Sequence, residues 1–204
     1  MLNSVSATSP QEEPRPAKTR LTADDRRRQL VGIGLAKLTE KPLHQLSIDE
    51  VAVEAGISRG LLFHYFPTKT DFYRAVVEAA GRRVLRNTAP DETRTAEEQL
   101  RAMVTGFIEQ VDRRRESYIS FARGASGGDL IVVEVYDRMR EEMTRRVMTS
   151  LSLEDGVRNV VHAWWAYVED HVIEWSRQSP ARRTSSVSDL TDHSIAALRT
   201  LLAL

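Results

Sequence analysis

Apolar positions along this chain recur at helical spacing from about residue 22 onward, and no stretch sustains the alternation that is typical of a β-strand. Several apolar runs are preceded by Ser or Thr with an acidic residue three positions later, a pair that satisfies free backbone N–H groups at a helix start. The pattern predicts nine helices, at about residues 22–40, 47–56, 58–66, 69–86, 95–115, 117–124, 129–150, 153–178 and 186–202. We therefore expect an all-α fold.

Residues 47–72 predict two short helices joined by a tight turn and followed by the start of a third helix. Gly56 can adopt the left-handed conformation that a helix end often needs, and Ser58 is a good N-cap for the next helix. Pro67 disfavours helix in the residue before it, so that second helix is short. One compact unit of this kind is the helix-turn-helix, whose second helix enters the major groove of DNA.

The exposed side of the second short helix carries Arg59, Gly60 and His64. Glycine weakens a helix by about 1 kcal/mol relative to alanine, so its presence needs a compensating advantage. A close approach to another surface, such as a phosphate backbone or a base edge, would provide one.

The run AGISRGLLFHYFPTKTDF, residues 55–72, resembles the TetR-type transcriptional regulators. The pattern of that family is roughly A-G-(V/I)-S-x-(G/P)-x-(L/F)-Y-x-(H/Y)-F-x-(S/T)-K-x-x-(L/F), and the resemblance covers about residues 24–72, roughly a quarter of the chain. One position departs from the pattern, because Phe63 stands where the family usually has tyrosine. A phenol that often binds phosphate is therefore missing, and the ring is expected to keep its packing role.

The resemblance implies a three-helix DNA-binding domain at residues 21–68 and a helical domain at residues 69–204 that binds a ligand and dimerises. The implied function is that of a homodimeric repressor, released from a near-palindromic DNA operator by a small and largely hydrophobic ligand. The residues themselves do not distinguish repression from activation. Arg59, Gly60 and Leu61 would lie near base edges. The other expected DNA contacts are Ser47, Ser58, His64, Tyr65 and Lys69. Arg27, near the start of the first helix, either contacts a phosphate or lies on a solvated face.

Net charge is zero over the whole chain, but the two parts differ. Residues 1–87 hold 14 basic and 10 acidic residues, and residues 88–204 hold 15 basic and 19 acidic residues. A positive N-terminal part suits a DNA-facing surface. Residues 1–20 are rich in Ser, Pro, Glu and Thr and are expected to form a disordered arm, whose basic residues either contact DNA or are simply solvated.

The helix expected at residues 153–178 carries a sustained apolar stripe, and the last helix carries another. Either these stripes complete the core of one chain, or they pair with the same helices of a second subunit in a four-helix interface. The resemblance implies the second arrangement. The interface residues would then be Trp165, Val168, Val172, Trp175, Leu198 and Leu201.

Aromatic residues in the C-terminal part favour a pocket between helices that takes an apolar ligand. A hydrophobic or acyl-like molecule with an anionic end would suit such a pocket, with Arg123 meeting the charge. The alternative is that these aromatic residues simply form the core. The candidate pocket residues are Phe107, Tyr118, Phe121, Arg123, Trp164 and Tyr167.

Several classes of function find no support in the sequence. Cysteine is absent, His162 and His171 are not at metal-ligand spacing, and the GASGG run at residues 124–128 lacks the lysine of a phosphate loop. We therefore expect no enzyme, no metal site and no cofactor. Without an apolar span or an export signal, we expect a cytoplasmic protein that does not enter a membrane.

One alternative from a different class remains. The chain would then be a helical protein–protein interaction module that docks through residues 61–66 and has no sequence-specific DNA binding. Salt-dependent binding to duplex DNA separates the two, because docking between proteins need not release counterions.

Overall fold

The computed structural model describes residues 21–38 and 45–203, apart from the side chains of residues 125 and 126. Within this part of the chain the secondary structure is entirely helical, as the apolar periodicity predicts. The α-helices are α1 (Ala23–Lys37), α2 (Ile48–Glu54), α3 (Arg59–Tyr65), α4 (Lys69–Asn87), α5 (Ala96–Arg113), α6 (Arg115–Ser126), α7 (Leu130–Ser150), α8 (Arg158–Arg177) and α9 (Val187–Leu202). Two 3₁₀ turns, η2 (Asp155–Val157) and η3 (Pro180–Arg182), flank α8. The arm expected at residues 1–20 lies outside the described residues.

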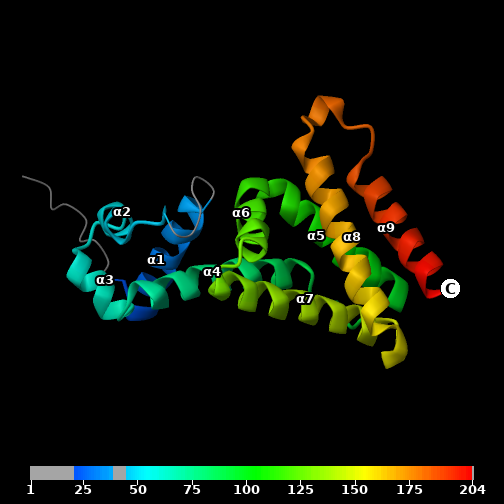
Figure 1. The fold of residues 1–204 in the computed structure, drawn as a ribbon, viewed down its shortest axis with the longest axis horizontal. Helices are drawn as coiled ribbons and strands as arrows, with labels where there is room; N and C mark the ends of the chain where they lie inside the picture. The colour runs from blue at the N-terminus through cyan, green and yellow to red at the C-terminus, as the bar shows by residue number, and fades with distance from the viewer. Residues whose placement is uncertain (1–20, 39–44, 204) are drawn as a thin grey trace, which may run out of the picture.

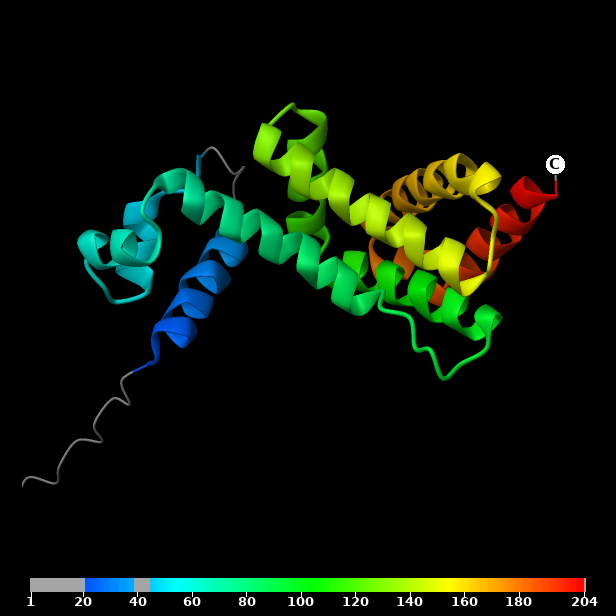
Figure 2. The ribbon, with the colours of Figure 1, turned by 90° about the horizontal axis from the view of Figure 1, so that it is seen from below.

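Helices α1, α2 and α3 lie together at one end of the molecule, and α8 and α9 lie at the other (Figure 1). Helix α4 packs on α1 at its start and runs into the second group, where it lies alongside α7 (Figure 2). Helix α4 therefore contacts both groups of helices and connects them mechanically. None of the described helices combines the length and the apolar character that crossing a membrane requires.

The N-terminal group is built on a close approach between α1 and α4. A Cβ at Gly34 would lie 2.5 Å from a Val76 methyl carbon and 3.0 Å from the Phe72 ring, so glycine is what allows these helices to touch. Leu62 and Phe66 are fully buried beneath α3. A helix of two turns is not stable alone, so this burial is what holds α3 in place.

The C-terminal group is centred on aromatic side chains. The ring of Phe107 meets those of Tyr118 and Trp165 edge to face, with centroids 5.6 and 5.5 Å apart, and Trp164 lies against Trp165. The indole N–H of Trp164 donates to the carbonyl of Ser194 over 2.8 Å. These contacts hold α8 to α5 on one side and to α9 on the other, and they hold α6 to α5.

Most helix starts agree with the capping signals in the sequence. Reciprocal capping boxes begin at Thr68, Thr95 and Ser186. N-cap hydroxyl groups also begin α1, α2 and α3. Local hydrogen bonding at a helix start depends on neighbouring residues only, which is why sequence alone locates it.

The start expected for the eighth helix, near Ser152, is wrong. Helix α8 begins at Arg158, after the 3₁₀ turn η2. Ser152 has a φ of +51°, in the left-handed region that non-glycine residues rarely adopt, so it lies in the turn that reverses the chain after α7.

The loop expected at residues 124–128 is shorter than predicted. Helix α6 continues through Gly124 to Ser126. A Cβ at Gly124 would lie 3.2 Å from a methyl carbon of Val132, so this glycine serves the packing of α6 on α7. The chain turns at Gly128, which has a φ of +78°, and Asp129 caps α7 as expected.

Candidate nucleic-acid interface and effector site

Helices α2 and α3 are joined by a turn at Gly56, which has a φ of +65°. The N–H of Ile57 donates to the carbonyl of Ala52 over 3.0 Å, and the Ser58 hydroxyl accepts from the N–H of Leu61 over 3.2 Å. Glycine adopts this conformation at little cost, as the sequence predicts for this position. The result is the geometry of a helix-turn-helix.

Helix α3 buries one side and exposes the other. Leu62 is buried, whereas Arg59, Gly60, Leu61 and His64 are exposed, and Leu61 keeps 40% of its surface accessible. The first residues of a recognition helix are those that reach base edges in the major groove. The structure therefore presents the residues that such a helix would use.

Arg59 is directed by two neighbours. Its Nη1 lies 3.2 Å from each carboxylate oxygen of Asp49 in α2, and its guanidinium carbon lies 5.5 Å from the centre of the Phe63 ring. The side chains of the ion pair are 62% and 61% exposed, so the pair is weak in water. Phe63 packs partly against the core, which agrees with its expected role. Asp49 carries no motif of its own, and sequence reasoning missed it.

Gly60 meets nothing within the protein that would require glycine. A Cβ at this position would have only the Ser58 hydroxyl oxygen nearby, at 4.0 Å. The fold of the described residues would therefore accept alanine at this position.

Arg27 and Tyr65 make contacts that organise α3. The Arg27 Nη1 donates to the carbonyl of Tyr65 over 2.7 Å, and its guanidinium carbon lies 4.2 Å from the centre of the Phe66 ring. A cation at the last turn of a helix satisfies carbonyl groups that have no partner in the helix. The Tyr65 ring is half-buried and meets the exposed His64 ring edge to face.

Lys69 is the first residue of α4 and is exposed, with its Nζ 4.9 Å from the centre of the Tyr73 ring. The N–H groups of a first helical turn have no partner within the helix and suit a phosphate. The hydroxyl groups of Ser47 and Ser58 accept hydrogen bonds from the first turns of α2 and α3. Contact of any of these residues with DNA stays a prediction.

The six residues expected to line a ligand pocket lie in different surroundings. Phe107 and Trp164 are fully buried in the aromatic core, and Arg123 and Tyr167 are exposed. For the two buried residues the alternative left open by the sequence, that they simply form the core, fits better. Tyr118 and Phe121 do line a cavity together, but Arg123 does not line it.

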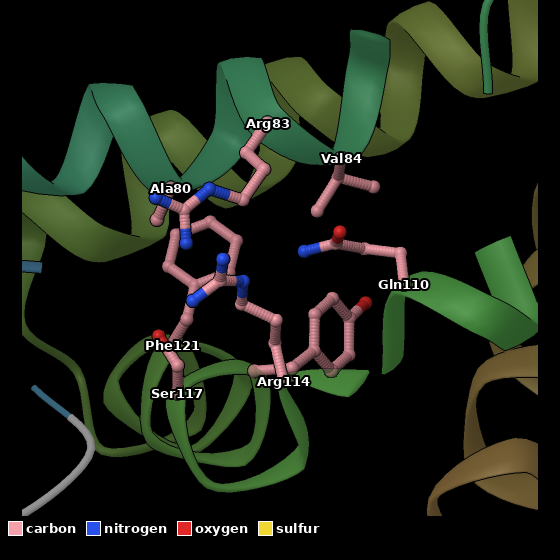
Figure 3. Close-up of a pocket in the computed structure, with 8 residues that line it drawn as sticks. Ala80, Arg83, Val84, Gln110, Arg114, Ser117 and Phe121 are labelled. Atoms are coloured by element: carbon pink, nitrogen blue, oxygen red, sulfur yellow. The ribbon is translucent and has the colours of Figure 1, made fainter. Parts of the chain in front are cut away.

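This cavity lies between α4 and the junction of α5 with α6 (Figure 3). Its volume is about 10 Å³, which is space for about one water molecule. Apart from Tyr118 and Phe121, the lining residues are Ala80, Arg83, Val84, Gln110, Arg114 and Ser117. The sequence carries no motif for these residues, because the packing of α4 against α5 and α6 brings them together.

The two arginines of the cavity have no carboxylate partner among the described residues. Burial lowers the pKa of Arg83, and the positive charges of Arg114 and Arg86 lower it further. The adjacent Arg82, in contrast, forms an ion pair with Glu78 over 3.2 Å. The cavity therefore carries positive charge that the described chain does not compensate.

Beneath the cavity lies a buried polar network. The carboxylate of Glu169 accepts hydrogen bonds from the hydroxyl groups of Tyr118 and Tyr136 and, over 2.9 Å, from Arg140 Nη1. Burial, and then the charge of Glu169, raises the pKa of both tyrosines, so each remains a neutral donor. Tyr118 thus belongs both to the cavity wall and to the network that joins α6, α7 and α8.

The expectation for a dimer interface needs correction. Five of the six residues named for it are buried within a single chain, so they offer no surface to a partner: Trp165, Val168, Val172, Trp175 and Leu198. The stripe on α8 faces the core of its own chain. Leu201 is 41% exposed and is the member of this set that a second subunit can reach.

Other residues of α8 and α9 are exposed and open to a partner. They are Ala163, Ala166 and Tyr167 on one face of α8, with Ala196 and Leu201 on α9. Small side chains let two helices approach each other closely, because the side chains at a contact set the distance between the axes.

Comparison with known proteins agrees with this architecture. A model described as bacterial regulatory proteins of the tetR family matches residues 34–76, the region of the helix-turn-helix. A second, described as a tetracyclin repressor-like C-terminal domain, matches residues 96–199, just over half of the chain. The chain belongs to the TetR family of bacterial regulators.

Relatives with similar sequences match only part of this chain. The activator FasR from Mycolicibacterium smegmatis is 30% identical over 106 residues, which are 48% of this chain and 46% of FasR. The regulator AcuR from Cereibacter sphaeroides is 40% identical over 50 residues, 24% of this chain and 23% of AcuR. The chain therefore spans less than half the length of these two relatives. A tetR-family regulator from Streptomyces coelicolor has the same fold, with a TM-score of 0.70, 23% identity and 90% of each chain covered.

The family match and the helix-turn-helix geometry together place the chain in a family of DNA-binding transcriptional regulators. Members of this family are regulators rather than enzymes; they bind DNA operators, dimerise and bind small-molecule effectors. The family match over the helix-turn-helix favours DNA binding over the alternative, a protein–protein interaction module without it.

Proposed function

We propose that this protein is a homodimeric repressor of the cytoplasm, which holds a near-palindromic operator and leaves it when a small molecule binds among the C-terminal helices. The observation that carries the proposal is the exposure of Arg59, Gly60 and Leu61 at the start of α3, above a fully buried Leu62. In a dimer, two such helices would enter successive major grooves about 34–36 Å apart.

The residues of this surface would divide the work. Arg59 would leave Asp49 and donate to a guanine edge, and Leu61 would lie against a thymine methyl group. His64 and Lys69 would meet phosphates, which set the position of the protein without reading sequence. The ion pair with Asp49 is exposed, so little energy is lost when Arg59 turns toward DNA.

The dimer would form through the exposed residues of α8 and α9 rather than through the buried stripe. A two-fold axis would place Ala166 and Tyr167 of each subunit against α9 of the other, in an isologous interface. The exposed Leu201, at the end of α9, would extend this interface.

Helix α4 supports a simple route between ligand and DNA. Lys69 stands at its first residue, and Ala80, Arg83 and Val84 line the cavity in its second half. A ligand that favours a different placement of α4 would change the spacing of the two recognition helices. It can shift this equilibrium only by its difference in affinity for the two states.

The direction of regulation is tested by transcription in vitro from a promoter that contains the selected operator. A repressor lowers the amount of transcript as the protein is added. A rise in transcript would contradict repression and make the protein an activator, as FasR is named.

A further inference from the structure

The cavity between α4 and the junction of α5 with α6 offers several hydrogen-bond donors and no negative charge. Its lining includes the guanidinium groups of Arg83 and Arg114 and the buried hydroxyl group of Ser117, and it includes no Asp or Glu among the described residues. Figure 3 shows the two arginines reaching the same space from opposite walls, with the amide end of Gln110 pointing into it.

The orientation of Gln110 follows from a contact behind it. Its Oε1 accepts a hydrogen bond from the Nδ2 of Asn87, at the end of α4. This bond directs the amide oxygen toward Asn87, and the two N–H donors of the amide face the cavity. A group that enters the cavity must accept hydrogen bonds from the amide and from the arginines.

The charge of the two arginines distinguishes them from their neighbours. Arg82, Arg113 and Arg115 each form an ion pair with a glutamate. Arg83 and Arg114 have no such partner within the described part of the chain, and Arg83 is half-buried. Two like charges that face one space repel each other, and an anion placed between them removes this repulsion.

The other walls of the cavity are apolar. Tyr118 and Phe121 are buried, and their rings lie 6.4 Å apart between centroids. The Tyr118 hydroxyl is already bound to Glu169, so this residue offers its ring to the cavity. Ala80 and Val84 add apolar surface from α4. A small hydrophilic ion gains nothing from such walls, whereas a hydrocarbon chain does.

We propose that this cavity binds the oxyanion head group, a carboxylate or a phosphate, of a small amphiphilic molecule, and that this molecule is the effector. The forks of Arg83 and Arg114 match the geometry of both head groups, and Gln110 adds a neutral donor. The hydrocarbon part lies against Phe121. The identity of the occupant as effector rests on the proposed function. Arg83 and Arg114 take the role that was expected of Arg123.

The size of the cavity links binding to movement. A volume of about 10 Å³ accepts little more than one oxygen atom, so a hydrocarbon chain reaches the buried Phe121 ring only if α6 and α4 separate. Gly81 lets α4 approach this region closely, since a Cβ there would lie 3.1 Å from Val135 and 4.0 Å from Phe121. Binding therefore favours a state in which α4 has moved, which is the movement that operator release needs.

The test compares ligands with the same chain and different heads. Binding of octanoate, octyl phosphate and octanol to the full-length protein is measured by calorimetry, and acetate serves as a head without a chain. The same ligands are then added to the complex with the selected duplex. Variants Arg83→Gln and Arg114→Gln remove one charge each. Arg82→Gln and Arg113→Gln, next to them in sequence, are the matched controls, and melting curves confirm that all four fold.

We expect one of the two octyl anions to bind at least about ten-fold more tightly than octanol and to release the duplex, because hydrogen bonds to charged groups are strong. The better of the two identifies the head group. Arg83→Gln and Arg114→Gln should each remove this preference for an anion, while octanol binding and both controls stay unchanged. Acetate should bind far more weakly than octanoate.

Three results would overturn the inference: octanol binding as tightly as the anions, neither anion binding, or equal losses in the control variants. An anion that binds through the two arginines yet leaves the duplex in place would remove its role as effector. A protein that binds these anions but no duplex would overturn the proposed function and leave the anion site standing. A dimer that binds its operator but does not bind the anions would overturn the anion site and leave the proposed function standing.

Discussion

Arg59 of α3 forms an ion pair with Asp49 of α2, with its Nη1 3.2 Å from both carboxylate oxygens, on the surface that is proposed to meet DNA. The residue best placed to read a base is therefore held by a neighbouring helix before DNA arrives. Asp49 directs the guanidinium group, but its own negative charge would stand close to the phosphates.

Removing that charge should strengthen DNA binding. Asp49→Asn frees Arg59 and deletes a repulsion, and exposed ion pairs are worth about 0.2–1 kcal/mol, so affinity for any duplex should rise by up to about five-fold. Fluorescence anisotropy at one salt concentration measures this change. Glu116→Gln, which removes an exposed carboxylate of α6, is the control and should have no effect. Weaker binding by Asp49→Asn would show that the pair positions Arg59 productively.

Substitution of Gly60 should separate an effect on DNA binding from an effect on folding. Gly60→Ala should leave the melting temperature unchanged or slightly higher, because a Cβ there meets only one atom, at 4.0 Å. If α3 lies close to DNA, the same methyl group should cost about 1–3 kcal/mol of binding energy, as overpacking does in protein interiors. Gly32→Ala, at an exposed position in α1 with nothing within 4 Å of the new Cβ, is the matched control. Full affinity in Gly60→Ala would rule out a close approach at this residue.

Replacing Arg59 and replacing Lys69 should impair DNA binding in different ways. Arg59→Ala is expected to relax discrimination at one base position, at a cost of about 1–3 kcal/mol for the preferred base. Lys69→Ala should weaken binding to all sequences alike and reduce the slope of log affinity against log salt by about one. Competition assays with single-base variants of the operator, at several salt concentrations, measure both. A loss confined to one sequence in Lys69→Ala would contradict its role as a phosphate contact.

Glu142 should make the free energy of unfolding depend on pH in acidic solution. Hydrogen bonds from Arg145 and Arg146 lower its pKa from an ordinary value of 4.5 to about 2. A carboxyl group with a lower pKa in the folded state contributes its full stability above pH 4.5 and loses it as pH falls toward 2. Arg146 also donates to the carbonyls of Leu85 and Thr88, so the loss would loosen the end of α4.

Urea unfolding at several pH values in that window tests this expectation. Glu142→Gln should be less stable than the original protein near neutral pH and should lose less of its stability as the pH falls. Glu174→Gln, on the surface of α8, is the control that should keep the original slope. An unchanged slope in Glu142→Gln would contradict the role of this carboxylate.

The dimer interface can be tested at the exposed residues of α8. Ala166→Arg should turn the dimer into a monomer, because a long charged side chain cannot be accommodated where two helices meet closely. Mass measurement in solution shows this directly, and binding to a palindromic duplex should fall much more than binding to a half-site. Ala181→Arg, at an exposed position in η3, should remain dimeric. A dimeric Ala166→Arg would move the interface elsewhere.

The sequence predicted those parts of the protein that depend on near neighbours. Gly56 and Ser58 define the turn before α3 through their own backbone and hydroxyl groups, and the structure confirms both. The apolar period likewise predicted all nine helices of the described chain, although α8 starts later than expected. A period shows that one face of a helix is buried.

The same period does not show what buries that face. Trp165 and Val168 were expected against a second subunit, and they pack within their own chain, where Phe107 meets Trp165. The sequence did not predict the cavity, for a related reason. Arg83 and Arg114 are far apart in sequence, and only the packing of α4 against the junction of α5 and α6 brings them to one space.

A dimer of this chain is proposed to recognise a particular DNA sequence. Selection of bound duplexes from a random pool, with the mass of the complex determined alongside, tests it most directly. We expect enrichment of a near-palindrome with half-sites about one helical turn apart, held by two subunits, and with an affinity that falls steeply with salt. No enrichment at low salt, or enrichment of a site held by a single subunit, would contradict it.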